Sequence, residues 1–492
     1  MQHIQQHSAA ANYSKGTFPP WGTRICKKRV AELANMNSRP ILIILAFIML
    51  PSTMIFGQSW KSEIGFNDLV SEKGGSLGDG TGLNVMQAEA PDSAGNYMPD
   101  VTSGEFAGKT FTEGSGAFGA NNHGTLVARN FYGNSSSMTG GISSITGYDA
   151  NDYIFNWLNA LSGNDLNSTP AFDIGNHSYV GNGLTTAQAE DILERFDFVI
   201  NRDNTLMVVG ANNGSTSATP QVLTPSYNAI AVGRSDGGHS QSLTSVYGAP
   251  RFATSIVVPS AGATSFSTPV VGSAAALLKH AGAGTDFVQN EVIRATLFAG
   301  ATKDEFASWD RTSTRPMDEV FGFGELNIFN SYHIFEGGQF EGSTTDPTSN
   351  INNQGWDYGD FDGSQDLFYD FSIASGGNAS LSAVLSWNMD IVDVNSGIAF
   401  EAERNLADLN LELFDSSGSF LGTLLDASNG SAYNNEHIFF EGLDGGNYTF
   451  RISGNSATDF GFSWNIQSVP EPSSATLLGL GAIAIIARRR RR

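Results

Sequence analysis

A helix that is buried along its length is the feature that most constrains the fold of this chain. The stretch from Val270 to Leu278 is apolar at nearly every position, with only Gly272 and Ser273 intervening, and such a run is typical of a helix enclosed in a core. Thr268 and Pro269 directly precede it. A capping hydroxyl followed by proline at the first helical position is a common helix start. The sequence therefore predicts a buried helix that begins near Pro269.

Ser265 lies just before this helix start, and capping does not explain it. Residues 262–269 read Gly-Ala-Thr-Ser-Phe-Ser-Thr-Pro. The run resembles the nucleophile motif of the subtilisin-like serine proteases, Gly-Thr-Ser-x-x-x-Pro, with Ala263 in place of the first glycine. The resemblance implies that Ser265 is the nucleophile of a hydrolase.

A histidine upstream matches the same family. Residues 122–128 read Asn-His-Gly-Thr-Leu-Val-Ala, which resembles the family's His-Gly-Thr-His-Val-Ala stretch at the start of a helix. The resemblance implies that His123 is the general base and that Gly124 lets another part of the backbone approach. The family's second histidine is Leu126 here, and it is not the proton carrier.

The acid is where the sequence departs from the family. Residues 82–89 read Gly-Leu-Asn-Val-Met-Gln-Ala-Glu and follow the family strand that ends in aspartate, so the resemblance places Glu89 as the acid that orients His123. Asp92, three residues later in an Asp-Ser pair, is the alternative acid. A glutamate can accept the imidazole N–H as an aspartate does.

An asparagine and a wall strand complete the resemblance. The apolar run 206–209 is typical of a buried parallel strand. The turn after it resembles the family's Ala-Gly-Asn, which implies that the Asn213 side chain donates into an oxyanion hole; a plain Asn-Asn-Gly turn is the structural alternative. Residues 172–181 resemble the edge strand against which substrate backbone pairs. Three of them are therefore expected to bind substrate: Ser178, Tyr179 and Gly181. His177 is expected to be a wall or packing residue and not a second base.

These matches define the expected fold and chemistry. The resemblance implies an α/β fold, a subtilisin-like doubly wound parallel sheet flanked by helices, with a further core strand at 227–234 and, at 256–260, the place where the family has its Ala-Pro-Gly turn. A serine is a weak nucleophile at its free pKa, and it needs a hydrogen-bonded base to take its proton during attack. No cofactor is required for such chemistry.

Composition sets outer bounds. The formal net charge is −23, from 49 acidic and 26 basic residues, which argues against nucleic acid as a partner and favours solubility outside the cell. The single cysteine, Cys26, excludes an intramolecular disulfide. Relatives of subtilisin often hold structural calcium, but no acidic loop of this sequence fixes such a site, so the metal ligands stay unknown.

The N-terminal residues 1–57 are expected to be a leader. An apolar core at 41–50 follows Arg39 and is typical of a secretion signal. Met36 is the expected true start. A signal anchor is the alternative, although the run is shorter than the ~20 residues that span a bilayer.

The rest of the chain is expected to form a catalytic domain at 58–335, a polar linker at 336–365 and a second domain at 366–468. Short alternating strands with Gly, Asn and Asp turns in this second domain predict an antiparallel β-sandwich. It resembles the pre-peptidase C-terminal domains found behind secreted bacterial proteases.

The tail at 469–492 has three parts. A Pro-Glu-Pro box at 470–472 precedes an apolar run at 475–487 and a cluster of arginines at 488–492. This pattern resembles the PEP-CTERM sorting signal, which implies transient membrane association through a short transmembrane helix and cleavage by an exosortase-type enzyme. The resemblance implies export to the cell envelope, the extracellular matrix or the medium. An ordinary tail anchor is the alternative.

Two functions follow from the sequence. The first is an exported serine endopeptidase that uses an acyl-enzyme on Ser265. The alternative is a catalytically inactive subtilisin-like scaffold that acts as a surface or matrix structural or adhesive protein, which Glu89 and Ala263 would fit.

Overall fold

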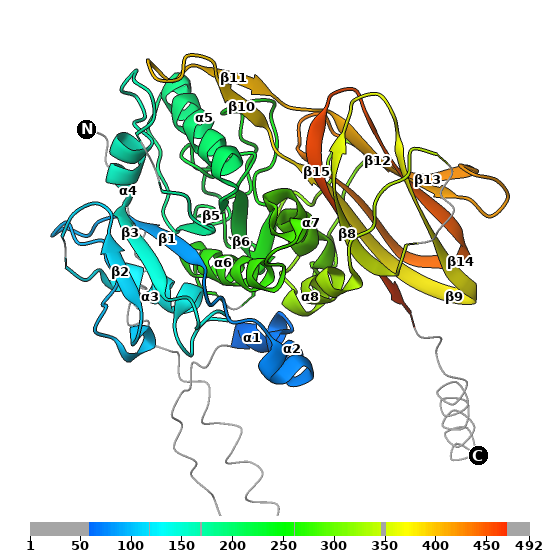
Figure 1. The fold of residues 1–492 in the computed structure, drawn as a ribbon, viewed down its shortest axis with the longest axis horizontal. Coiled ribbons are helices and arrows are strands. Elements are labelled where there is room, and N and C mark those ends of the chain that lie inside the picture. Colours follow the sequence, from blue (N-terminus) through cyan, green and yellow to red (C-terminus); the bar gives the residue numbers. More distant parts are fainter. Residues whose placement is uncertain (1–58, 118, 168–169, 260, 346–350, 470–492) are drawn as a thin grey trace, which may run out of the picture. The chain divides into compact units, whose positions relative to one another are not determined.

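The computed structural model describes residues 59–117, 119–167, 170–259, 261–345 and 351–469 (Figure 1). The expected leader at 1–57 and nearly all of the expected sorting tail lie outside these ranges. Within them, no helix is long and apolar enough to cross a membrane. The expected short membrane helix at 475–487 lies outside the described residues.

A parallel sheet forms the first half of the chain. Seven strands run in the order β2-β3-β1-β4-β5-β6-β7, and every neighbouring pair is parallel. The strands are β1 (Asn84–Glu89), β2 (Thr110–Glu113), β3 (Ser144–Asp149), β4 (Ile174–His177), β5 (Leu206–Gly210), β6 (Ile230–Arg234) and β7 (Ile256–Val258). Strand order reverses at β1, and the carboxyl ends of strands at such a switch point are where ligands bind in open α/β sheets.

Helices cover both faces of this sheet. They are α1 (Ser59–Glu63), α2 (Phe66–Lys73), α3 (Asn122–Tyr132), α4 (Ala150–Asp152), α5 (Thr186–Asp203), α6 (Thr264–Ala281), α7 (Asn290–Gly300) and α8 (Ile328–Gly337), with short turns η1 (Gly74–Ser76), η2 (Gly104–Phe106), η3 (Tyr153–Trp157) and η4 (Asp286–Val288). Alternate strand residues face opposite sides. Val208 packs in the cluster that includes α3 and α6, whereas Met207 and Val209 pack in the cluster that includes α5.

The second half is antiparallel. Six strands run in the order β13-β12-β14-β9-β15-β8, and β10 pairs with β11 beside them. The strands are β8 (Gln354–Phe361), β9 (Leu367–Trp387), β10 (Asp390–Asp393), β11 (Ala402–Asn405), β12 (Leu409–Asp415), β13 (Thr423–Ser428), β14 (Asn435–Gly454) and β15 (Thr458–Ser468). The long strands β9 and β14 pair with register shifts near their middles.

This sheet closes over its own core. Tyr369, at the start of β9, has its ring centroid 4.9 Å from that of Phe462, although Phe462 is paired with Leu385 near the other end of β9. The inner face of the sheet therefore encloses an aromatic core between its two ends. The expected α/β fold followed by an antiparallel β-sandwich is confirmed.

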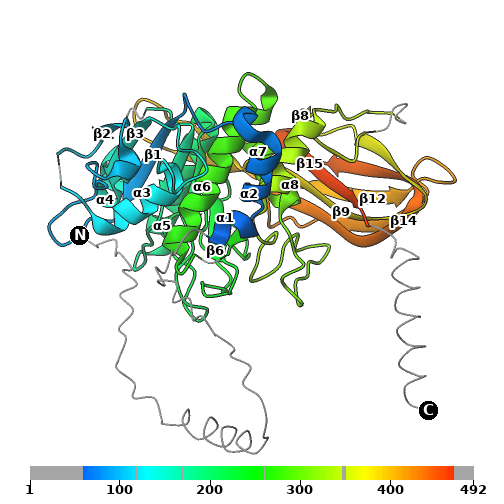
Figure 2. The ribbon, with the colours of Figure 1, turned by 90° about the horizontal axis from the view of Figure 1, so that it is seen from below.

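Helices α7 and α8 lie between the parallel and the antiparallel sheets (Figures 1 and 2). The range 336–365, expected as a linker, contains β8 and so supplies an edge strand of the antiparallel sheet. Its Trp356 is buried in the core of the first half, and the indole N–H donates to the Phe335 carbonyl at 3.2 Å. The polar composition of this range did not predict a strand. The strand lies against α8, and a single apolar ring, that of Trp356, holds it there.

Candidate active site

The carboxyl end of β1 holds Glu89. Its side chain is fully buried, and its Oε1 accepts a hydrogen bond from Nδ1 of His123 at 2.8 Å. The second carboxylate oxygen, Oε2, is buried and has no hydrogen-bond partner among the described residues. A buried carboxylate with one contact needs a cation or a strong donor nearby, and His123 supplies it.

His123 lies in the first turn of α3. Asn121 caps this helix by accepting from the Gly124 N–H at 3.0 Å, and Gln87 on β1 donates to the Gly124 carbonyl at 3.0 Å. A Cβ on Gly124 would lie 3.2 Å from Glu89 Cγ and 3.2 Å from the Tyr97 carbonyl oxygen. The expected close approach at Gly124 is therefore present, and it places β1 directly against the histidine.

The environment of His123 perturbs its acidity. Burial of the imidazole lowers the pKa of His123, but the charge of Glu89 and the hydrogen bond to it raise this pKa. The net pKa lies above the ordinary value of 6.5. The contact with Glu89 thus stabilises the imidazolium form, as a base that gains a proton requires.

Ser265 lies in the first turn of α6 and is almost completely buried. The helix begins at Thr264, and the expectation that it begins near Pro269 is wrong. Pro269 lies inside the helix, where its missing N–H leaves the Ser265 carbonyl without its helical donor. The Thr268 hydroxyl, expected as a cap, instead donates to the Thr264 carbonyl at 2.8 Å.

His123 and Ser265 lie in the first turns of α3 and α6, two helices that pack against each other. Phe266 packs on the imidazole, with ring centroids 5.8 Å apart. Within the described part of the chain, neither Oγ of Ser265 nor Nε2 of His123 has a hydrogen-bond partner, although both atoms are buried. Buried polar atoms are nearly always paired in folded proteins, so two such atoms in adjacent first turns mark a functional site.

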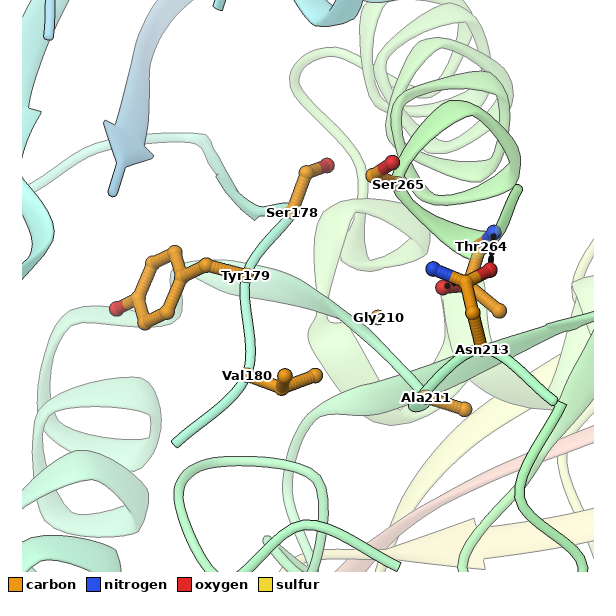
Figure 3. Close-up of a pocket in the computed structure, with 8 residues that line it drawn as sticks. All are labelled: Ser178, Tyr179, Val180, Gly210, Ala211, Asn213, Thr264 and Ser265. Atoms are coloured by element: carbon orange, nitrogen blue, oxygen red, sulfur yellow. Dashed lines mark hydrogen bonds between the residues drawn. The ribbon is translucent and has the colours of Figure 1, made fainter. Parts of the chain in front are cut away.

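Asn213 follows β5 and reaches the start of α6. Its Oδ1 accepts from the Thr264 N–H at 2.9 Å and from the Thr264 hydroxyl at 3.3 Å. Figure 3 shows that this arrangement turns the Asn213 amide nitrogen away from Thr264 and toward the space beside Ser265 and Ser178. The two hydrogen bonds to Oδ1 thereby orient the amide nitrogen of Asn213, which is the donor.

A pocket opens beside Ser265 (Figure 3). Its empty space, mouth included, is about 260 Å³. Its lining comprises Ser178, Tyr179, Val180, Gly210, Ala211, Asn213, Thr264 and Ser265. Sequence reasoning missed four of them, Val180, Gly210, Ala211 and Thr264. Each lies within three residues of a residue that the motifs singled out, and that proximity is the signal that could have found them.

Only two of the three residues expected to bind substrate line the pocket. Ser178 and Tyr179 line the pocket, but Gly181 does not; its carbonyl accepts from the backbone N–H groups of Gln221 and Val222, both at 3.1 Å. His177 is fully buried, its Nδ1 is 3.0 Å from the Tyr179 hydroxyl, and burial lowers its pKa to about 3. It therefore stays neutral and packs the wall, as expected.

The alternative acid, Asp92, is engaged elsewhere. Its Oδ1 accepts from the backbone N–H groups of Ala94 at 2.8 Å and of Asn96 at 2.9 Å. Hydrogen bonds from Asn96 and Ala94 outweigh the opposing effect of burial and lower the pKa of Asp92. The structure brings Glu89, and not Asp92, to His123.

One group of side chains in the described ranges has the geometry of a metal site: Glu72, His333 and Glu336. The ammonium of Lys73 lies 2.8 Å from Glu72 and 2.6 Å from Glu336. A lysine that already neutralises both carboxylates does not fit calcium, which prefers a set of oxygen ligands.

Comparisons with known proteins add two findings. Residues 468–492 match the family model described as the PEP-CTERM protein-sorting motif, so the expected sorting motif is confirmed. It marks an exported protein that is handled at the cell envelope and recognised by an exosortase-type sorting enzyme. No curated protein matches the chain.

Solved structures similar to this chain include subtilisin-like proteases. A cold-adapted subtilisin-like serine proteinase is 17% identical, with 51% of this chain and 88% of that chain covered and a TM-score of 0.34. Fervidolysin from Fervidobacterium pennivorans, described as a keratinolytic enzyme related to subtilisin, is 12% identical over 78% and 60% of the two chains, with a TM-score of 0.38. A protease from Pseudoalteromonas arctica PAMC 21717 is 14% identical over 52% and 91%, with a TM-score of 0.34.

Proposed function

We propose that the protein is an exported serine endopeptidase that hydrolyses peptide bonds through an acyl-enzyme on Ser265. The observation that carries the proposal is the arrangement of Glu89, His123 and Ser265. A buried carboxylate accepts from Nδ1 of the imidazole at 2.8 Å, while Nε2 and the serine hydroxyl are both buried and unpaired in the described structure. The Nδ1 contact leaves Nε2 as the ring nitrogen that can act as the base.

The reaction begins with attack of Ser265 Oγ on the carbonyl carbon of the substrate. A C–O bond forms, and the hydroxyl proton passes to Nε2 of His123. His123 then gives this proton to the leaving amine as the C–N bond breaks. A water molecule attacks the ester, His123 takes its proton, and return of that proton to Ser265 Oγ releases the acid and restores the serine.

Two donors are available for the developing oxyanion. The Ser265 N–H belongs to the first turn of α6 and has no intrahelical acceptor. The Asn213 amide is held by Thr264 with its nitrogen toward the pocket. Donors that are oriented before the reaction stabilise charge that appears in the transition state.

Labelling with a fluorophosphonate tests the proposal. We expect stoichiometric modification of Ser265 and hydrolysis of a casein substrate, both lost in Ser265→Ala and His123→Ala. Ser267→Ala is the matched control, because this serine is buried in the same helix and its hydroxyl donates to the Ala263 carbonyl at 3.4 Å. A folded protein that neither labels nor cleaves would instead be the inactive scaffold.

We further propose that the tail is removed and that the rest of the chain is released to the matrix or the medium. The support is the sorting motif at 468–492. Mass spectrometry of the protein recovered from producing cells tests this fate, and a mature mass that still includes Arg492 would contradict it.

A further inference from the structure

The pocket beside Ser265 lies between two segments of the chain, which form its walls. One wall is the segment Ser178–Val180, which follows β4, and the other is Gly210–Asn213, at the end of β5. None of the residues that line the pocket carries a charge. A charged side chain would therefore enter without a counter-ion and lose solvation.

The spacing of the walls is fixed by one segment that bonds to both. At one end of it, Gln221 and Val222 donate to the Gly181 carbonyl, both at 3.1 Å. At the other end, the Thr224 hydroxyl donates to the Gly210 carbonyl at 3.1 Å. A Cβ on Gly181 would lie 2.8 Å from Val222 Cγ2, so this contact is already tight. The walls cannot separate easily to admit a large group.

The Val180 side chain extends from one wall toward the other. Figure 3 shows its side chain directed toward Gly210 and Ala211, whereas the Tyr179 ring is directed away from the pocket. The Tyr179 hydroxyl is held by His177 at 3.0 Å, which fixes that outward rotamer. The branched side chain of Val180 therefore shortens the pocket, and Gly210 opposite it contributes no side chain.

We propose that this pocket receives the side chain on the acyl side of the scissile bond and that Val180 restricts it to small, uncharged residues such as glycine, alanine and serine. This inference rests on the proposed peptidase function. Ser265 and Asn213 both line the pocket. When the carbonyl carbon lies at Ser265 and its oxygen lies at Asn213, the side chain of the same residue enters the adjoining space.

The test compares two peptide p-nitroanilides that differ only in alanine or phenylalanine at the acyl position, using the full chain. We expect kcat/KM for the alanine substrate to exceed that for phenylalanine by about 100-fold, because overfilling a rigid pocket costs a few kcal/mol. In Val180→Gly, cleavage after phenylalanine should rise by about 10-fold or more. Val180→Ala should give an intermediate gain, so the test does not depend on one variant folding.

The outcomes separate the two claims. Equal cleavage of both substrates, or a preference that Val180→Gly leaves unchanged, would overturn the role of Val180 and leave the peptidase standing. No cleavage of either substrate and no fluorophosphonate labelling of Ser265 would overturn the proposed function and this inference with it. Fluorophosphonate labelling of Ser265 in the parent chain is the internal control, since it reports on the nucleophile independently of the two peptide substrates.

Discussion

The extra methylene of Glu89, relative to aspartate, is accommodated by the absence of a side chain at Gly124. The Glu89 Cγ lies 3.2 Å from where a Cβ on Gly124 would stand. The longer acid therefore fills space against α3, and its carboxylate still reaches Nδ1 of His123 at 2.8 Å. At the residue scale, Glu89 and Gly124 form a matched pair, and the departure from aspartate is compatible with an oriented histidine.

The pH dependence of activity tests this pair. His123 must be neutral to act as a base, so kcat/KM should rise with pH through its pKa, which lies above 6.5 because the effects of Glu89 outweigh burial. In Glu89→Gln the charge is lost and burial remains, so this acid limb should move to lower pH. The maximal kcat should fall by about 1,000- to 10,000-fold.

Asp92→Asn is the matched control for the pH profile. It removes a carboxylate that caps the turn to Asn96 and should leave the acid limb in place. An acid limb that moves in Asp92→Asn and stays in Glu89→Gln would exchange the roles of the two acids.

Asn213 gives a second prediction at the residue scale. Asn213→Ala removes the amide donor, and kcat should fall by about 100- to 1,000-fold while KM changes little, because the donor acts on charge that is present only in the transition state. Steady-state kinetics on a peptide substrate measures both constants. Asn212→Ala is the control, since that side chain does not line the pocket. A rise in KM alone would assign Asn213 to substrate binding.

At the scale of elements, local patterns predicted most of the site. Glu89, His123, Asn213 and Ser265 each lie within three residues of the end of a strand or the start of a helix whose own residues specify it. The start of α6 was missed because Pro269 is usually a terminal residue, whereas here its ring is tolerated inside the helix. The segment 221–224 was missed because its role depends on hydrogen bonds to Gly181 and Gly210, which no local pattern encodes.

The crossing of α3 and α6 sets the relation between His123 and Ser265. Gly272 on α6 lies at this crossing, and a Cβ there would stand 3.2 Å from a ring carbon of Phe131 and 3.3 Å from Val208. Both neighbours are fully buried, so neither can move freely. Close packing of this kind transmits a small change in volume to the helix positions.

Gly272→Ala should therefore destabilise the protein, although alanine favours a helix by about 1 kcal/mol over glycine. We expect urea unfolding to show a net loss of about 1–3 kcal/mol and kcat/KM to fall by about 10-fold, because small displacements of catalytic groups lower rates. Gly104→Ala is the control, since its Cβ would meet nothing within 4 Å. Unchanged activity with lowered stability would show that the crossing does not set the site.

At the scale of the whole molecule, Arg294 on α7 ties the two sheets together. The guanidinium is buried and donates to the Asn228 carbonyl at 2.7 Å, to the Trp387 carbonyl at 2.8 Å and to the Ser386 hydroxyl at 3.1 Å. Asn434 donates to the Tyr227 carbonyl at 2.8 Å. These bonds join the region before β6 to the end of β9, and the described residues fall in one compact unit.

The antiparallel sheet should therefore be an integral part of the folded protein. Denaturant unfolding followed by tryptophan fluorescence and by loss of peptide hydrolysis should give one coincident transition. Arg294→Ala leaves buried acceptors unpaired and should lower the free energy of unfolding by about 3 kcal/mol, with the two signals still coincident. Arg404→Ala is the control, because its 3.4 Å contact with Glu194 is partly exposed and worth about 1 kcal/mol at most. If the hydrogen bonds of Arg294 couple the two halves, both halves unfold together. Peptide hydrolysis that persists after a first fluorescence transition would therefore show that the antiparallel sheet unfolds independently of the parallel sheet.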